Sequence, residues 1–117
     1  MARKTNTKWR RWPPGNARLK VLIEEAILDA YNESEQRTGF YTMLDEHLDT
    51  LFETQILGVT ATVARIEMKD DDQIVAICQR GRTRQAIPLL DLPLPDPRPG
   101  GAEWIEAYRL WARGVEA

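Results

Sequence analysis

The sequence contains only one cysteine and one histidine among its 117 residues. The lone Cys78 excludes an intramolecular disulfide, and its place in the apolar run IVAIC predicts a buried thiol that acts as a small hydrophobe. The lone His47 excludes the multi-histidine ligand sets that zinc usually requires, and it is predicted to lie at the edge of the core. No run of about 18 apolar residues and no signal-peptide pattern is present, so the expected location is the cytoplasm.

Signatures of catalysis and of the EF-hand are also missing. No serine occupies a nucleophile-elbow pattern, and no glycine-rich phosphate loop is present. An EF-hand template that starts at Asp70 fits Asp72, but Gln73, Ile74 and Ile77 do not match its remaining positions and its glycine is absent. The sequence therefore predicts a protein that is not an enzyme and that has no EF-hand.

The formal net charge of −2 hides a strong asymmetry along the chain. Residues 1–20 carry seven basic and no acidic residues, whereas residues 21–53 carry nine acidic residues against a single base, Arg37. The remaining residues 54–117 carry nine acidic and eight basic residues. Such a distribution points to partners of opposite charge for the two N-terminal segments.

The chain has the length of one domain, and we expect a basic arm over residues 1–17 and a single domain over residues 18–117. Apolar residues at i, i+3 and i+4 spacing predict an acidic amphipathic helix from Arg18 to about Glu35. Gly39 is expected to interrupt it, and the same spacing returns in a second acidic helix over residues 40–51.

The second half of the sequence is predicted to be mainly β-structure. β-Branched residues after Glu53, with turns at Gly58, at residues 69–72 and at Gly81, predict four short antiparallel strands curled into an SH3-like barrel. The segment IPLLDLPLPDPRPGG, with five prolines, should run as an extended strap. A C-terminal helix, ended by Gly114 and docked on the barrel by Trp104 and Trp111, completes a predicted α+β fold.

Five carboxylates are candidate ligands for a metal ion. Glu25, Asp29 and Glu33 have the i, i+4, i+8 spacing of one helix face, and Asp45 and Asp49 are second candidates on the next helix. Carboxylate oxygens are the ligands that Ca²⁺ prefers, and a cation would relieve their mutual repulsion. The alternative is an acidic face that is only solvated, which is common on helices and which spacing by itself does not exclude. The acidic turn at residues 69–72 is either a weak cation site or a set of turn-forming residues.

The N-terminal stretch RKTNTKWRRW mixes basic residues with Trp9 and Trp12. This combination suits phosphate attraction and base stacking, so nucleic acid is a possible partner of the arm. The alternative is an arm that docks on the acidic helices or improves solubility. A protein or nucleic-acid interaction module, using the acidic helical face and the basic arm, is accordingly the second functional hypothesis.

The order of the segments gives a more specific indication. The stretches EEAILDAYNESEQ with GFY after it, and IPLLDLPLP leading to EWIEAYR, resemble the small bacterial calcium-binding proteins of the CcbP type, first recognised in cyanobacteria. The resemblance covers roughly residues 19–111. It implies a cytoplasmic calcium buffer or sensor, with helices around a small β barrel, that binds Ca²⁺ through acidic surface residues and without an EF-hand.

Overall fold

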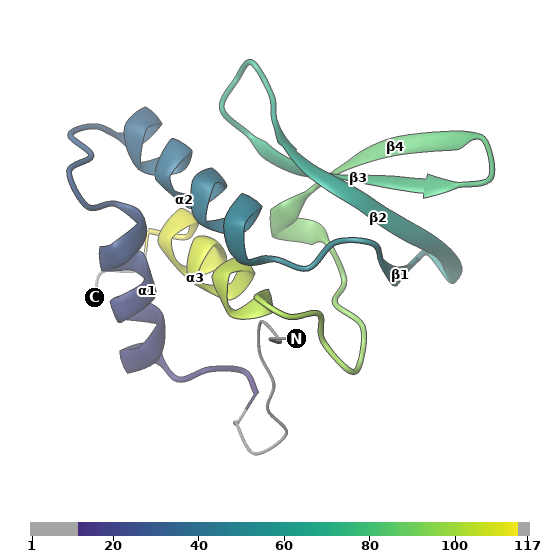
Figure 1. Ribbon diagram of the computed structural model, residues 1–117, viewed down its shortest axis with the longest axis horizontal. Helices are drawn as coiled ribbons and strands as arrows, with labels where there is room; N and C mark the ends of the chain where they lie inside the picture. The colour runs from purple at the N-terminus through teal and green to yellow at the C-terminus, as the bar shows by residue number, and fades with distance from the viewer. Residues whose placement is uncertain (1–11, 115–117) are drawn as a thin grey trace.

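The computed structural model describes residues 12–114 and has an α+β architecture. A group of three helices occupies one end of the described part, and one antiparallel sheet occupies the other end (Figure 1). In chain order the elements are α1 (Asn16–Ala26), α2 (Glu33–His47), β1 (Phe52–Ile56), β2 (Val59–Met68), β3 (Ile74–Arg80), β4 (Thr83–Pro88), the short 3-10 helix η1 (Leu89–Asp91) and α3 (Ala102–Ala112).

The acidic stretch that was predicted as one helix up to Glu35 is two helices. Helix α1 ends at Ala26, and residues 27–32 form a non-helical α1–α2 connection in which Asp29 has a left-handed φ of 64°. Asn32 then caps α2: its side chain accepts a hydrogen bond from the Glu35 backbone N–H at 2.8 Å. The Glu35 carboxylate in turn accepts from the Tyr31 N–H at 2.6 Å. These two hydrogen bonds fix a new helix start, which hydrophobic periodicity alone does not reveal.

Gly39 was predicted to break the helix, but it lies inside α2. A Cβ atom at this position would lie 2.0 Å from the backbone oxygen of Ala26. The glycine therefore allows the backbone of α2 to approach the end of α1 more closely than any side chain would permit. Its role is helix packing and not helix termination.

The four strands form an open sheet in the order β1-β2-β3-β4. The predicted turns are confirmed: Leu57 and Gly58, both with positive φ, connect β1 to β2, and Gly81 begins the turn between β3 and β4. Positive φ at both central residues of a two-residue turn matches the twist of the flanking strands. Strands β1 and β4 are the two edges in this order, and the SH3-like barrel is not confirmed.

Helix α3 packs against both α1 and α2. It is terminated by Gly114 as predicted: this glycine has a left-handed φ of 75°, and its N–H donates to the backbone oxygen of Trp111. Its tryptophans contact α2, and their expected docking onto a barrel is not confirmed. Trp104 stacks on His47 with 5.3 Å between ring centroids, and Trp111 lies 5.2 Å from Phe40. The core joins helices, strands and strap through fully buried side chains, among them Leu22, Phe40, Leu44, Val63, Ile74, Leu89, Leu92 and Ile105.

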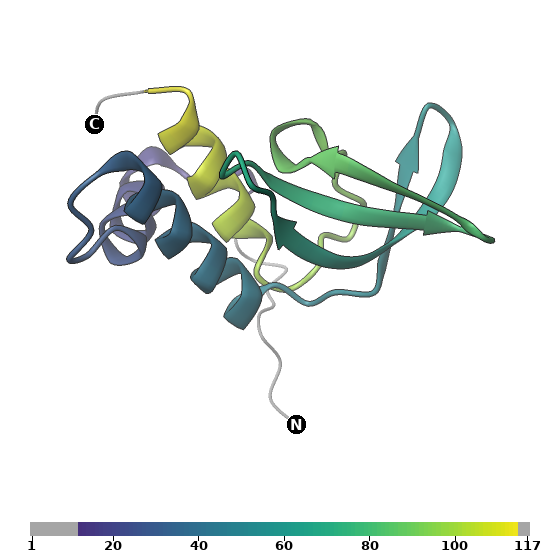
Figure 2. The same ribbon diagram turned by 90° about the horizontal axis from the view of Figure 1, so that it is seen from above.

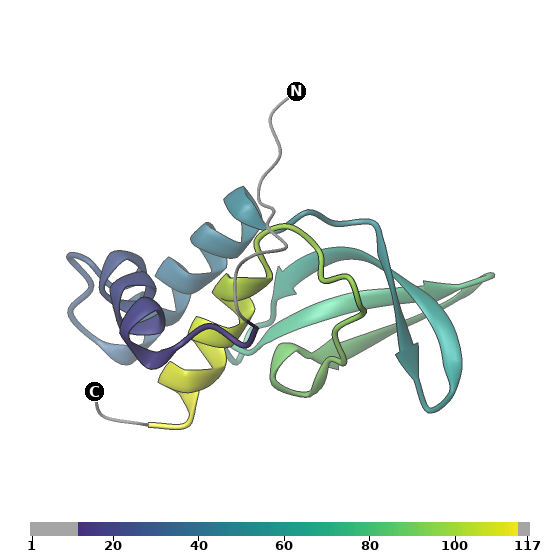
Figure 3. The ribbon, with the colours of Figure 1, turned by 90° about the horizontal axis from the view of Figure 1, so that it is seen from below.

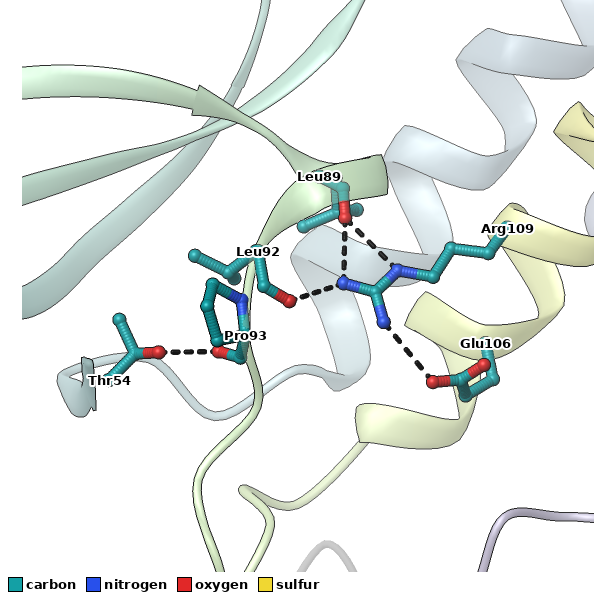
Figure 4. Close-up of polar contacts among 6 residues, drawn as sticks. All are labelled: Thr54, Leu89, Leu92, Pro93, Glu106 and Arg109. Atoms are coloured by element: carbon teal, nitrogen blue, oxygen red, sulfur yellow. Dashed lines mark hydrogen bonds and ion pairs between the residues drawn. The ribbon is translucent and has the colours of Figure 1, made fainter. Parts of the chain in front are cut away.

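A proline-rich strap, residues 89–101, connects the sheet to α3 as an irregular segment, in line with the prediction. Two side chains attach it to the rest of the fold (Figure 4). The Arg109 guanidinium of α3 donates to the backbone oxygens of Leu89 and Leu92, and it pairs with Glu106 at 3.2 Å. From β1, the buried hydroxyl of Thr54 donates to the backbone oxygen of Pro93. These bonds satisfy strap carbonyls that have no partner in a sheet.

Candidate metal centre

Three of the five predicted ligands lie around the α1–α2 connection. Glu25 is in the last turn of α1, Asp29 is in the connection itself and Glu33 is the first residue of α2, and all three are exposed. Because α1 ends at Ala26, these residues do not form the continuous row on one helix face that their spacing predicted. They are instead grouped by the chain reversal between two helices.

The other two predicted ligands lie toward the opposite end of α2. Asp45 is near its last turn and Asp49 follows it, and both are exposed. Twelve residues of a single helix separate Glu33 from Asp45, which corresponds to about 18 Å at 1.5 Å per residue. Calcium binds its oxygens at about 2.3–2.6 Å, so ligands of one ion lie within roughly 5 Å of one another. The five carboxylates therefore cannot share one ion, and they divide into two groups.

Several of these acidic residues already take part in local interactions. Glu33 pairs with Arg37 at 3.3 Å, one helical turn further on. Glu33 and Glu35 both lie in the first turn of α2, where the helix dipole favours negative charge. The backbone N–H of Asp49 donates to Gly100 at 2.8 Å and connects the end of α2 to the strap. Helix capping and dipole interactions thus account for part of the acidic cluster.

The donor chemistry suits a hard cation, since exposed carboxylate oxygens are typical calcium ligands. The geometry is not that of a preformed centre. Within residues 12–114, no three His, Cys, Asp or Glu side chains are grouped closely enough to hold a metal ion. A cation at the α1–α2 connection would have to draw its carboxylates together.

The second acidic cluster, in the turn between β2 and β3, has a structural explanation. Asp72 adopts a left-handed φ of 67°, and the Asp71 carboxylate accepts a hydrogen bond from the Gln73 N–H at 3.0 Å. Lys69 and Gln73 close the turn through their backbone at 2.9 Å. Short acidic side chains stabilise such turns through bonds of this kind. The turn-forming interpretation of this cluster is favoured.

His47 and Cys78 do not combine with these carboxylates into a metal site. His47 is partly exposed and stacks on Trp104, as expected for a histidine at the edge of the core. Cys78 is buried in β3, and burial raises the pKa of its thiol. A thiol that stays protonated at neutral pH is a poor metal ligand.

Trp9 and the basic residues before Trp12 lie outside the described residues, so the nucleic-acid hypothesis is not tested. Trp12 itself was expected to be available in the arm, but it is half-buried. The guanidinium of Arg98 in the strap lies 4.5 Å from the centroid of its ring. This cation–π contact attaches the start of the described chain to the strap.

These features define a small α+β domain whose helical end carries a cluster of carboxylates. The chain belongs to the CcbP-type family, which is described as calcium binding and whose profile matches residues 20–112. The crystal structure of CcbP from Anabaena has the same fold, with a TM-score of 0.63 and 19% sequence identity. That comparison covers 92% of this chain and 100% of the Anabaena chain. No curated protein is similar enough to this chain to count as a match.

The family that the sequence resemblance indicated is therefore confirmed, and its calcium ion is the expected ligand. In the part of the chain that the structure describes, no helix is long and apolar enough to cross a membrane. Sequence reasoning missed the capping interactions of Glu35, although Asn followed three residues later by Glu is a recognised helix-start pattern.

Proposed function

We propose that this protein binds Ca²⁺ reversibly through the carboxylates that flank the α1–α2 connection, with Glu25, Asp29 and Glu33 as ligands. The observation that carries the proposal is the match to a calcium-binding family over residues 20–112, which includes this connection. Asp29 is central because it lies in the non-helical part, between the two helix ends. Backbone carbonyls and water would complete the six to eight oxygens that calcium takes.

The arrangement favours modest affinity and rapid exchange. The three carboxylates are exposed and do not converge, so binding must overcome their repulsion and order their side chains. The Glu33–Arg37 pair would have to open, but an exposed ion pair of this kind contributes little to stability. We therefore expect a dissociation constant on the order of 10⁻⁴ M, weaker than that of a rigid high-affinity site. Buffering or sensing at high local calcium fits this range.

The direct test is calorimetric titration of the chelator-stripped protein with calcium, with magnesium as the reference ion. We expect saturable binding of calcium that magnesium does not reproduce, because Mg²⁺ demands a regular octahedral site. Asp29→Asn should weaken calcium binding at least about tenfold, since it removes a charged ligand. Asparagine tolerates the left-handed backbone at this position, so the fold should be preserved.

A matched variant separates the two acidic groups. Asp45→Asn removes one carboxylate from the far end of α2 and leaves the connection unchanged. We expect it to bind calcium as the unmodified protein does. If Asp45→Asn abolishes binding and Asp29→Asn does not, the ligands belong to the other group. If calcium produces neither heat nor a shift in melting temperature at millimolar concentration, the proposal fails.

A further inference from the structure

The half of the sheet farthest from the helices contains a groove that plays no part in the proposed calcium binding. It lies between the β1–β2 and β3–β4 hairpins and has a volume of about 380 Å³. Its apolar lining includes Ile56, Val59, Ala61 and Cys78, and Arg80 contributes a charged side chain. The inner half of the sheet is buried against the helices and the strap, whereas this half is open.

The charged residues in the strand segments around the groove are all basic. Residues 54–64 are uncharged, and residues 73–90 contain Arg80, Arg82 and Arg84 without a single carboxylate. Arg80 bonds the backbone oxygen of Thr60 at 3.0 Å and so extends across the groove end between β3 and β2. An apolar groove beside uncompensated arginines is complementary to a segment that combines apolar side chains with carboxylates.

Leu57 at the edge of this groove is not explained by folding. It is 97% exposed and adopts a left-handed φ of 52° in the turn between β1 and β2. Asn, Asp or Gly would be favoured at such a turn position, and burial gives leucine no advantage there. An apolar residue that the turn geometry disfavours and that the core does not bury indicates a position that contacts a partner.

The complementary chemistry is present on the same chain, at the other end of the molecule. Within the α1–α2 connection Leu28 is 73% exposed and Tyr31 is 86% exposed, and Asp29 lies between them. Glu24 and Glu25 precede them in α1, and residues 21–36 contain no base. This end therefore presents apolar side chains within a strongly acidic surface.

The two ends are too far apart to meet within one molecule. Figure 1, Figure 2 and Figure 3 all place the α1–α2 connection at one end of the long axis, and the β1–β2 and β3–β4 turns at the other end. The extent of the molecule along this axis is 40 Å. A contact between them requires two molecules.

We propose that the groove of one copy receives the α1–α2 connection of a second copy, in a head-to-tail contact. Leu28 and Tyr31 enter the apolar groove beside Leu57, and the carboxylates around them face the arginines of the β3–β4 hairpin. The two surfaces differ, so the contact is heterologous and can repeat along a chain of molecules. The contact is small, and weak association is therefore expected.

Sedimentation velocity in the presence of chelator tests this contact independently of calcium binding. We expect the average mass of the unmodified protein to rise with concentration up to roughly 1 mM, and the rise to shrink with added salt. Two variants each block one surface: Leu57→Asn with Arg80→Gln in the groove, and Leu28→Ser with Tyr31→Ser in the connection. Each variant alone should associate at least about tenfold more weakly.

Mixing the two variants gives the decisive result. Each retains one intact surface, so the mixture should form a one-to-one complex that does not grow further. Leu90→Ser, which changes an exposed leucine in η1 away from both ends, should associate as the unmodified protein does. A protein that remains monomeric throughout, a dimer that survives both double variants, or a mixture without a complex would overturn the proposal. Unchanged melting curves establish that all variants are folded.

Discussion

Gly39→Ala places two physical effects in direct opposition. Alanine is about 1 kcal/mol more favourable than glycine inside a helix, so propensity alone predicts a more stable protein. The new Cβ, however, would lie 2.0 Å from the Ala26 backbone oxygen and 3.1 Å from its carbonyl carbon. Because carbon atoms essentially never come within 3.0 Å of a backbone oxygen in this way, α2 must move by at least about 1 Å from the end of α1.

The clash should decide the outcome. Overpacking a rigid site costs about 1–3 kcal/mol, and a backbone oxygen cannot rotate away as a side chain can. Movement of α2 also loosens the contacts of the buried Phe40 with Tyr108 and Trp111 of α3. Because the clash is with backbone, we take the upper end of this range, about 3 kcal/mol, and after subtraction of the propensity gain of about 1 kcal/mol we expect the free energy of unfolding to fall by about 2 kcal/mol. The melting temperature should fall by about 6–12 °C.

Urea and thermal unfolding of Gly39→Ala measure this change, and Thr38→Ala is the matched control. Thr38 is the preceding residue of α2 and is exposed, so its replacement changes helix propensity without creating a clash. We expect Thr38→Ala to be neutral or slightly stabilising, by roughly 0.5 kcal/mol. A Gly39→Ala protein that is as stable as the control would show that the close approach of the helices does not constrain this position.

Three further predictions concern the strap, the thiol and the arm. Arg109→Lys removes the planar guanidinium that donates to two strap carbonyls, so the free energy of unfolding in urea should fall by about 1–3 kcal/mol. Unchanged stability would mean that the ammonium group of lysine is sufficient. Burial raises the pKa of the Cys78 thiol, so at neutral pH a disulfide reagent should label the folded protein at least about tenfold more slowly than the unfolded protein. The labelling rate of the folded protein should rise only at higher pH. Fast labelling of the folded protein at neutral pH would contradict this prediction. If the arm binds nucleic acid, a gel shift should weaken with salt and disappear when residues 1–16 are deleted, whereas the absence of any shift at low salt would exclude this role.

Local pattern and composition predicted much of the fold. The four strands, their turns at Gly58 and Gly81 and the C-terminal helix were predicted because β-branched runs, turn residues and helical spacing all agree there. The break after Ala26 was missed because Ile27 and Ala30 continue the apolar spacing of α1. The cap formed by Asn32 determines where the second helix begins, and its effect depends on side-chain hydrogen bonds that periodicity does not report.

Properties that depend on contacts between distant segments were harder to predict. Gly39 has the same appearance in the sequence whether it ends a helix or admits a neighbouring backbone, and only the position of Ala26 distinguishes the two. Closure of a sheet into a barrel likewise depends on whether its edges pair, which strand patterns do not encode. Sequence spacing placed the proposed ligands Glu25, Asp29 and Glu33 on one helix face, whereas in the structure they lie on two helices and the connection between them.

The pairing of α1 with α3 determines when folding can be completed. The first and last helices contact each other, and Arg18 pairs with Glu103 at 3.0 Å across a sequence separation of 85 residues. The sheet differs, because its strands pair in sequence order and its hairpins can form while the chain is short. During synthesis, the parts of the apolar stripes of α1 and α2 that pack on α3 must remain uncovered until residues 102–112 leave the ribosome. A nascent chain stalled before α3 should accordingly depend on chaperones, although its sheet is already formed.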